Sequence, residues 1–126
     1  FKGADKTALC TDAMRGAGMP DGESILGSLT NGQKVIIEDG VAKLPDRSAF
    51  AGSVATADRL VRTMISIAGI PLIDAIRMIT LTPARILHVD SQKGSLEEGK
   101  DADIVIFDNQ INVTTTISKG HVIYNQ

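Results

Sequence analysis

The sequence predicts an α/β chain that finishes in a small antiparallel sheet, and three observations lead to this fold class. A short apolar run lies at residues 7–13, apolar residues recur at helical spacing from residue 56 to 87, and strand-like runs fill residues 102–124. Strands and helices do not alternate as they would in a regular βαβ fold. The order is most simply explained as the end of a barrel followed by a small β appendage.

The first half of the chain should be mostly strand and loop. Residues 7–13 (TALCTDA) form an apolar run without strict alternation, typical of a strand buried on both faces, with Cys10 inside it. Residues 14–27 are rich in Gly and contain Pro20-Asp21-Gly22, which predicts a long mobile loop. Strand-like residues 34–38 and 41–44 flank Asp39-Gly40, a pair suited to a two-residue hairpin turn.

Three helices and then strands are expected in the second half. The spacing predicts a helix over Thr56–Ala68, with Thr56 as N-cap and Gly69 after its end. Pro71 suits the first turn of a second helix, and Thr82 should cap a third that runs to Leu87. The final strands are predicted at residues 102–107, 112–118 and 121–124.

Composition excludes several classes of function. The chain has 126 residues, of which 43% are hydrophobic and 22% charged, and a net charge of −2. That charge is too small to favour nucleic acid or an anionic membrane as a partner. No run approaches the roughly 20 apolar residues of a membrane span, and the first residues lack a signal-peptide pattern. With Cys10 as its single cysteine, the chain is expected in the cytoplasm, and its opening at Phe1 suggests the interior of a longer protein.

Four segments together resemble one family. They are Leu9–Ala13 (LCTDA), Phe50–Ser53 (FAGS), Arg77–Arg85 (RMITLTPAR) and Gly94–Asp103 (GSLEEGKDAD). The last is similar to a strand pair common across the amidohydrolase superfamily, and the four in this order resemble the N-acetylglucosamine-6-phosphate deacetylases along essentially the whole chain.

The resemblance implies the C-terminal part of a metal-dependent (β/α)₈ barrel with strands of a small β-sandwich appendage. Residues 1–93 would supply the last barrel strand, a hairpin and the following helices, and residues 94–126 the sandwich strands. A complete barrel needs about 250 residues. The divalent metal (Zn, Fe or a similar ion) would be held by a Glu and two His outside this chain, so no metal is expected here and the chain alone should be inactive.

The resemblance also implies the reaction. The parent enzyme would hydrolyse the acetamide of N-acetylglucosamine 6-phosphate to acetate and glucosamine 6-phosphate, acting as a carbon–nitrogen hydrolase on a linear amide. Asp12 would take a proton from the attacking water and pass it to the leaving amine. The alternative role for Asp12 is structural, as the cap of the loop that follows it.

Ala51, Gly52 and Ser53 are the implied substrate-binding residues, with Gly52 permitting close approach of the backbone. His88 and His121 lack metal-site spacing and are expected to be structural or exposed. Exposed apolar faces, with Leu60, Ile65 and Ile76, lead us to expect a homo-oligomer. Two other functions stay open: another metal-dependent amidohydrolase, such as a dihydroorotase-like enzyme, and a non-catalytic assembly module.

Overall fold

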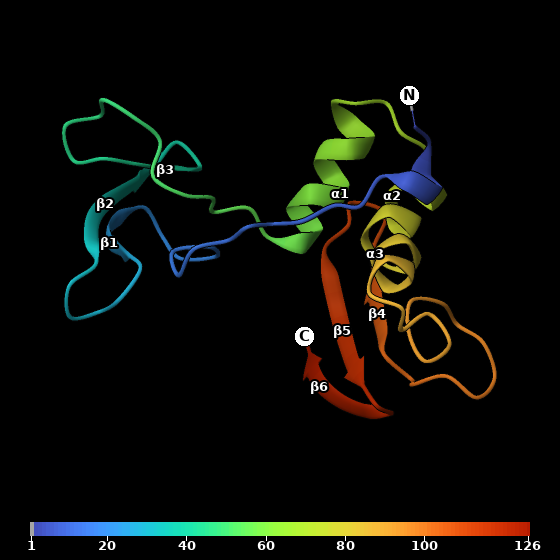
Figure 1. Cartoon of the computed structure of the whole chain (residues 1–126). Helices are drawn as coiled ribbons and strands as arrows, with labels where there is room; N and C mark the ends of the chain where they lie inside the picture. Colours follow the sequence, from blue (N-terminus) through green and yellow to red (C-terminus); the bar gives the residue numbers. More distant parts are fainter. Residues whose placement is uncertain (1) are drawn as a thin grey trace. The chain divides into compact units, whose positions relative to one another are not determined.

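The computed structural model describes residues 2–126, and its internal packing divides the chain into two compact units. One unit comprises residues 10–57, and the other comprises residues 2–9 together with 58–126. Each unit contains its own three-stranded antiparallel sheet, as Figure 1 shows. No helix among the described residues is long and apolar enough to cross a membrane.

The unit of residues 10–57 is built on the sheet β1-β2-β3. Its strands are β1 (Gly22–Leu26), β2 (Gln33–Glu38) and β3 (Val41–Lys43). Asp39 and Gly40 join β2 to β3 with φ angles of 54° and 71°, so the predicted two-residue hairpin turn is confirmed. Ile37, Ala42 and Val54 form the apolar core of this unit, and Met14 packs against them.

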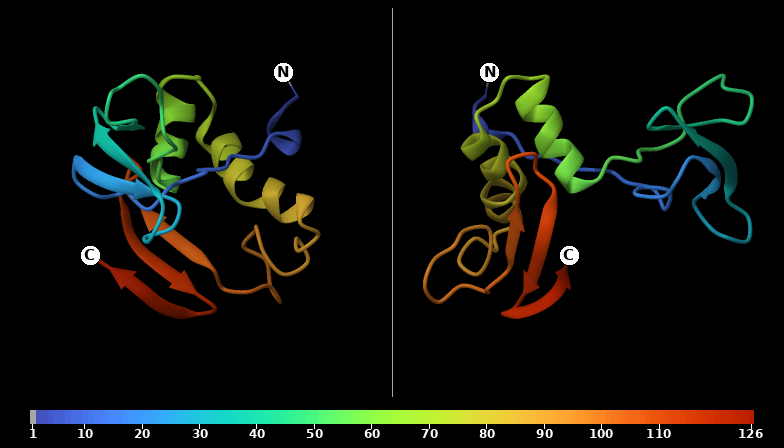
Figure 2. Two further views of the ribbon diagram at one scale, coloured as in Figure 1. Left: turned by 60° about the vertical axis from the view of Figure 1, so that its left-hand side comes forward. Right: turned by 180° about the vertical axis from the view of Figure 1, so that it is seen from behind.

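The other unit combines helices with the sheet β4-β5-β6. Its elements are η1 (Ala4–Lys6), α1 (Ala57–Ser66), α2 (Leu72–Ile79), α3 (Leu81–Ile86), β4 (Ile104–Phe107), β5 (Val113–Ser118) and β6 (His121–Asn125). The views of Figure 2 show the helices gathered at the end of the sheet where β4 finishes and β5 begins. Val61 of α1, Ala75 of α2 and Ile111 of the β4–β5 loop form the core there.

The helix and strand boundaries largely follow the sequence. Gly69, with a φ of 66°, follows α1 and lets the Ile70 N–H bond the Met64 carbonyl at 3.0 Å. Pro71 precedes α2 directly, as its fixed φ favours. The three final strands are confirmed within two residues at either end.

Thr82 does not have its predicted role. It lies inside α3, which begins one residue earlier, and its hydroxyl donates to the Ala4 carbonyl at 2.7 Å. This hydrogen bond satisfies a side chain that is 1% exposed and ties the N-terminal turn to the helices. A tertiary partner has therefore replaced the local cap.

Two predictions about the first half are wrong. Residues 7–12 do not form a strand, and Cys10 is exposed rather than buried. A strand needs a partner along its length, and the described residues pair with this segment's backbone only at Leu9 and Ala13–Met14. The predicted mobile loop, residues 14–27, is also partly ordered. Its second half forms β1, which pairs with β2.

The apolar residues expected on an open face are better covered than predicted. Leu60, Ile65 and Ile76 are half-buried, and the last two pack against the cluster of Val61, Ala75 and Ile111. Ile65 and Ile76 are covered because α1, α2 and the β4–β5 loop meet around that cluster.

Candidate active site

The predicted substrate-binding segment lies between β3 and the residues that follow Asp12. On one side, the Ala51 N–H donates to the Ala42 carbonyl at 2.8 Å. On the other side, the Met14 N–H donates to the Ser53 carbonyl at 2.8 Å, and Ala13 pairs with Ser53 in parallel. The fold therefore brings the two predicted parts of the site, residue 12 and residues 51–53, side by side within one unit.

Asp12 is exposed and stands in a left-handed backbone conformation, with a φ of 46°. Aspartate is among the few residues with a side chain that enter this region readily. Its carboxylate makes no hydrogen bond or ion pair with any residue from 2 to 126. To cap the following loop, this carboxylate would have to accept a hydrogen bond from a backbone N–H, and it accepts none from residues 2–126.

Both the backbone conformation and the packing at residue 52 favour glycine. Its φ is 96°, and an added Cβ would lie 3.2 Å from Leu26 Cδ1 and 3.3 Å from Met14 Cγ. Neither the N–H nor the carbonyl of Gly52 has a hydrogen-bonding partner in the part of the chain that the structure describes. This exposed backbone, next to the pairing that carries Asp12, can offer a donor and an acceptor to a polar ligand.

Ala51 and Ser53 differ from Gly52 in what they leave for a ligand. The Ala51 side chain is 5% exposed and its N–H is bonded to β3, so its carbonyl oxygen is the polar atom that remains. The Ser53 hydroxyl oxygen accepts from the Ala55 N–H at 3.1 Å and keeps its own proton to donate.

A charged cluster holds the turn that leads into this segment. Arg47 donates to both carboxylate oxygens of Glu38, at 2.8 Å from Nε and 3.0 Å from Nη2. Lys43 Nζ lies 3.1 Å from the same carboxylate. The hydrogen bonds from Arg47, and then Lys43, lower the pKa of Glu38. The cluster holds residues 44–49 against the β2–β3 hairpin. It therefore also determines the position of the predicted substrate-binding segment, which starts at Ala51.

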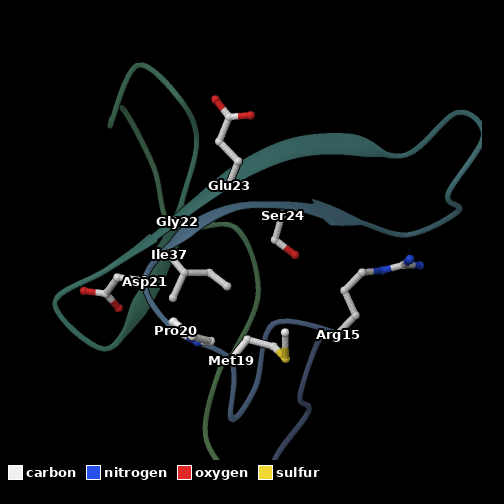
Figure 3. A pocket seen from close by; sticks show the side chains of 8 residues that line it. All are labelled: Arg15, Met19, Pro20, Asp21, Gly22, Glu23, Ser24 and Ile37. Carbon is white, nitrogen blue, oxygen red and sulfur yellow. The ribbon is translucent and has the colours of Figure 1, made fainter.

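A hollow of about 370 Å³ lies in the same unit, beside β1 and the turn before it. Figure 3 shows Arg15, Met19, Ser24 and Ile37 around it, with the Glu23 carboxylate pointing away. It includes none of the predicted site residues, and the sequence gives no sign of it, because the Gly-rich stretch that contains β1 is typical of a loop. The sequence gives no sign of Met14 either, since there it is only the first residue of that stretch.

The described residues do not suit a metal ion. No group of three or more His, Cys, Asp or Glu side chains within residues 2–126 is arranged to hold one. His88 follows α3 and His121 begins β6, and both are exposed.

Residues 6–123 match the model of the amidohydrolase family. The chain belongs to the amidohydrolase family. This family is generally metal-dependent. Residues 2–126 of this amidohydrolase chain do not fit such an ion, and the chemistry that they can supply themselves is proton transfer and hydrogen bonding to a substrate.

Curated relatives narrow the comparison to deacetylases of amino-sugar phosphates. The chain is 39% identical over 118 residues to a candidate N-acetylgalactosamine-6-phosphate deacetylase of Escherichia coli K12, covering 94% of this chain and 68% of that protein. It is 39% identical to the N-acetylgalactosamine-6-phosphate deacetylase of E. coli O157:H7 and 41% identical to the N-acetylglucosamine-6-phosphate deacetylase of Lysinibacillus sphaericus. It spans only 30% of the length of each of these two.

Solved structures agree with the predicted fold class. The N-acetylglucosamine-6-phosphate deacetylase of Pasteurella multocida matches 96% of this chain with a TM-score of 0.85 and 30% identity. An aspartate-to-alanine mutant of the Mycobacterium smegmatis deacetylase, in complex with N-acetyl-D-glucosamine 6-phosphate, matches 98% with a TM-score of 0.84. The chain covers 31% and 32% of these two structures.

Proposed function

We propose that this chain is the C-terminal portion of a cytoplasmic amino-sugar-phosphate deacetylase and contributes its proton-transfer group. The polypeptide that carries it would hydrolyse N-acetylglucosamine 6-phosphate to glucosamine 6-phosphate and acetate. The observation that carries this proposal is the pairing of Ala13 and Met14 with Ser53. It sets the Asp12 carboxylate beside the Gly52 backbone, and neither group has a hydrogen-bonding partner among residues 2–126. In this proposal residues 1–93 belong to the barrel and residues 94–126 to the appended sandwich.

The chemistry needs one group that both accepts and donates a proton. When water attacks the acetamide carbonyl, Asp12 takes a proton from the water oxygen as the new C–O bond forms. When the C–N bond breaks, Asp12 gives that proton to the nitrogen, which leaves as a neutral amine. Gly52 and Ser53 would hold the sugar through backbone and hydroxyl hydrogen bonds, so that the acetamide stays near Asp12.

The sugar itself has two candidates that differ in configuration at one carbon. Relatives of both kinds, acting on the N-acetylglucosamine or the N-acetylgalactosamine 6-phosphate, match the chain at nearly equal identity. Acetate release from each sugar phosphate by the full-length polypeptide, measured side by side, decides between them. A divalent ion would be bound by residues outside this chain, and a second copy would cover exposed apolar residues such as Ile67 and Ile73.

The decisive experiment is Asp12→Asn in the full-length polypeptide. Asparagine keeps the shape and the left-handed backbone but cannot accept the proton, so kcat should fall by ~10² or more. KM, metal content and the melting temperature should change little, because the Asp12 side chain has no partner among residues 2–126 to lose.

Asp21→Asn is the matched control, since Asp21 is an exposed carboxylate of the same unit outside the proposed site. It should retain the wild-type kcat. If Asp12→Asn turns over within a few-fold of wild type, the assignment of Asp12 is wrong.

A further inference from the structure

We infer that Met14 is the positioning residue for Asp12, a role that rests on the proposed function. Met14 lies two residues after Asp12 and is the point where this segment is fixed to its unit. Its backbone N–H is bonded to Ser53, while its half-buried side chain packs against Ile37, Ala42 and Val54.

Three observations concern this one side chain. Besides the apolar cluster, Met14 Sδ accepts the Gly16 N–H at 2.9 Å. Met14 Cγ and Cβ occupy the space that a side chain at residue 52 would need, 3.3 and 3.5 Å from the position of its Cβ. The Met14 side chain therefore packs against the core of the unit and beside Gly52, two residues along the chain from Asp12.

The Asp12 side chain has no hydrogen-bonding or ionic partner among residues 2–126, and the φ of Asp12 is 46°. The pairing of Ala13 and Met14 with Ser53 connects this segment to the residue next to Gly52, and farther along the Arg15 guanidinium donates to the Gly27 carbonyl after β1. The packing of Met14 therefore sets the position of the Asp12 carboxylate relative to Gly52.

The test is a double-mutant cycle in the full-length deacetylase. Met14→Ala removes most of the packed side chain. It should lower kcat roughly 10- to 100-fold, the usual result of displacing a reacting group by about an ångström. Met14→Leu, which nearly conserves volume, should stay within about threefold of wild type. In an Asp12→Asn background, Met14→Ala should change kcat by less than about threefold, because its effect passes through Asp12.

A purely structural role predicts a different pattern. Met14→Ala would then lower the melting temperature but leave the kcat of the folded enzyme intact, or would lower kcat equally with and without Asp12; either result overturns the inference. If Met14→Ala does not fold, Met14→Val removes the sulfur and terminal methyl with less loss of packing and is subject to the same criteria. Wild-type kcat in Asp12→Asn alone would instead overturn the proposed function, and the positioning role with it.

Discussion

Replacing Gly52 by alanine separates backbone strain from a steric effect on the site. The φ of 96° costs a residue with a Cβ about 1–2 kcal/mol, as left-handed conformations do. The new methyl would also stand 3.2 Å from Leu26 Cδ1 and 3.3 Å from Met14 Cγ, so both side chains must shift by a few tenths of an ångström. Such overpacking costs about 1–3 kcal/mol. We expect Gly52→Ala to lower the free energy of unfolding by about 2–5 kcal/mol.

Gly27→Ala provides the matched control. Gly27 belongs to the same unit and has a similar φ of 85°, but no atom lies within 4 Å of the position of its Cβ. It should lose only the backbone part, about 1–2 kcal/mol. Urea titration of both variants measures the two free energies, and their difference isolates the contact with Met14 and Leu26.

Kinetics then decide whether that contact matters for catalysis. Because Met14 must yield to the new methyl group, Asp12 moves with it, and kcat of Gly52→Ala should drop by ~10-fold or more. Gly27→Ala should keep the wild-type kcat. Equal kcat values in the two alanine variants would refute the reasoning, whatever their stabilities.

Two further predictions concern the other unit of the chain. Thr82→Val keeps the shape of a side chain that is 1% exposed but removes the donor to the Ala4 carbonyl, so thermal or urea unfolding should show a loss of about 1–2 kcal/mol, whereas Thr82→Ser should retain most of the hydrogen bond. The hydrogen bond from Lys93, and then the Lys119 N–H, lowers the pKa of Asp103 below its ordinary 3.8, so its stabilising effect is present above that pH and is lost as the pH falls through the lowered value. The stability difference between wild type and Asp103→Asn, measured by urea titration from pH 7 to pH 2, should therefore shrink below about pH 4, and a constant difference would contradict the ion-pair explanation.

The sequence was sufficient wherever local chemistry decides the structure. Asp39-Gly40 forms its turn because both residues tolerate positive φ, and Gly69 and Pro71 bound the helices through their own backbone constraints. The final strands follow from runs of β-branched and apolar residues.

Prediction failed where a distant partner decides. Thr82 resembles a cap because a Thr-Pro pair commonly begins a helix, but the Ala4 carbonyl lies within reach of its hydroxyl. β1 was not predicted, because the Gly, Pro and Asp residues before it are typical of a loop. Its strand conformation depends on pairing with β2. Residues 7–12 are the reverse case, an apolar run that has no strand beside it among the described residues.

The signature segments of this amidohydrolase chain contain carboxylates of two physical kinds. Asp101 and Asp103, from the segment GKDAD, both accept from Lys93 Nζ, and Asp103 also accepts the Lys119 N–H at 2.8 Å. Their partners account for their presence: both carboxylates bind Lys93 within the loop before β4, and Asp103 also fastens this loop to the turn before β6. Asp12, from LCTDA, has no partner among residues 2–126 that would explain it structurally. Asp103→Asn should therefore lower the free energy of unfolding, whereas Asp12→Asn should lower kcat. If Asp103→Asn instead lowers kcat and Asp12→Asn lowers the stability, the partners of a signature residue do not reveal its role.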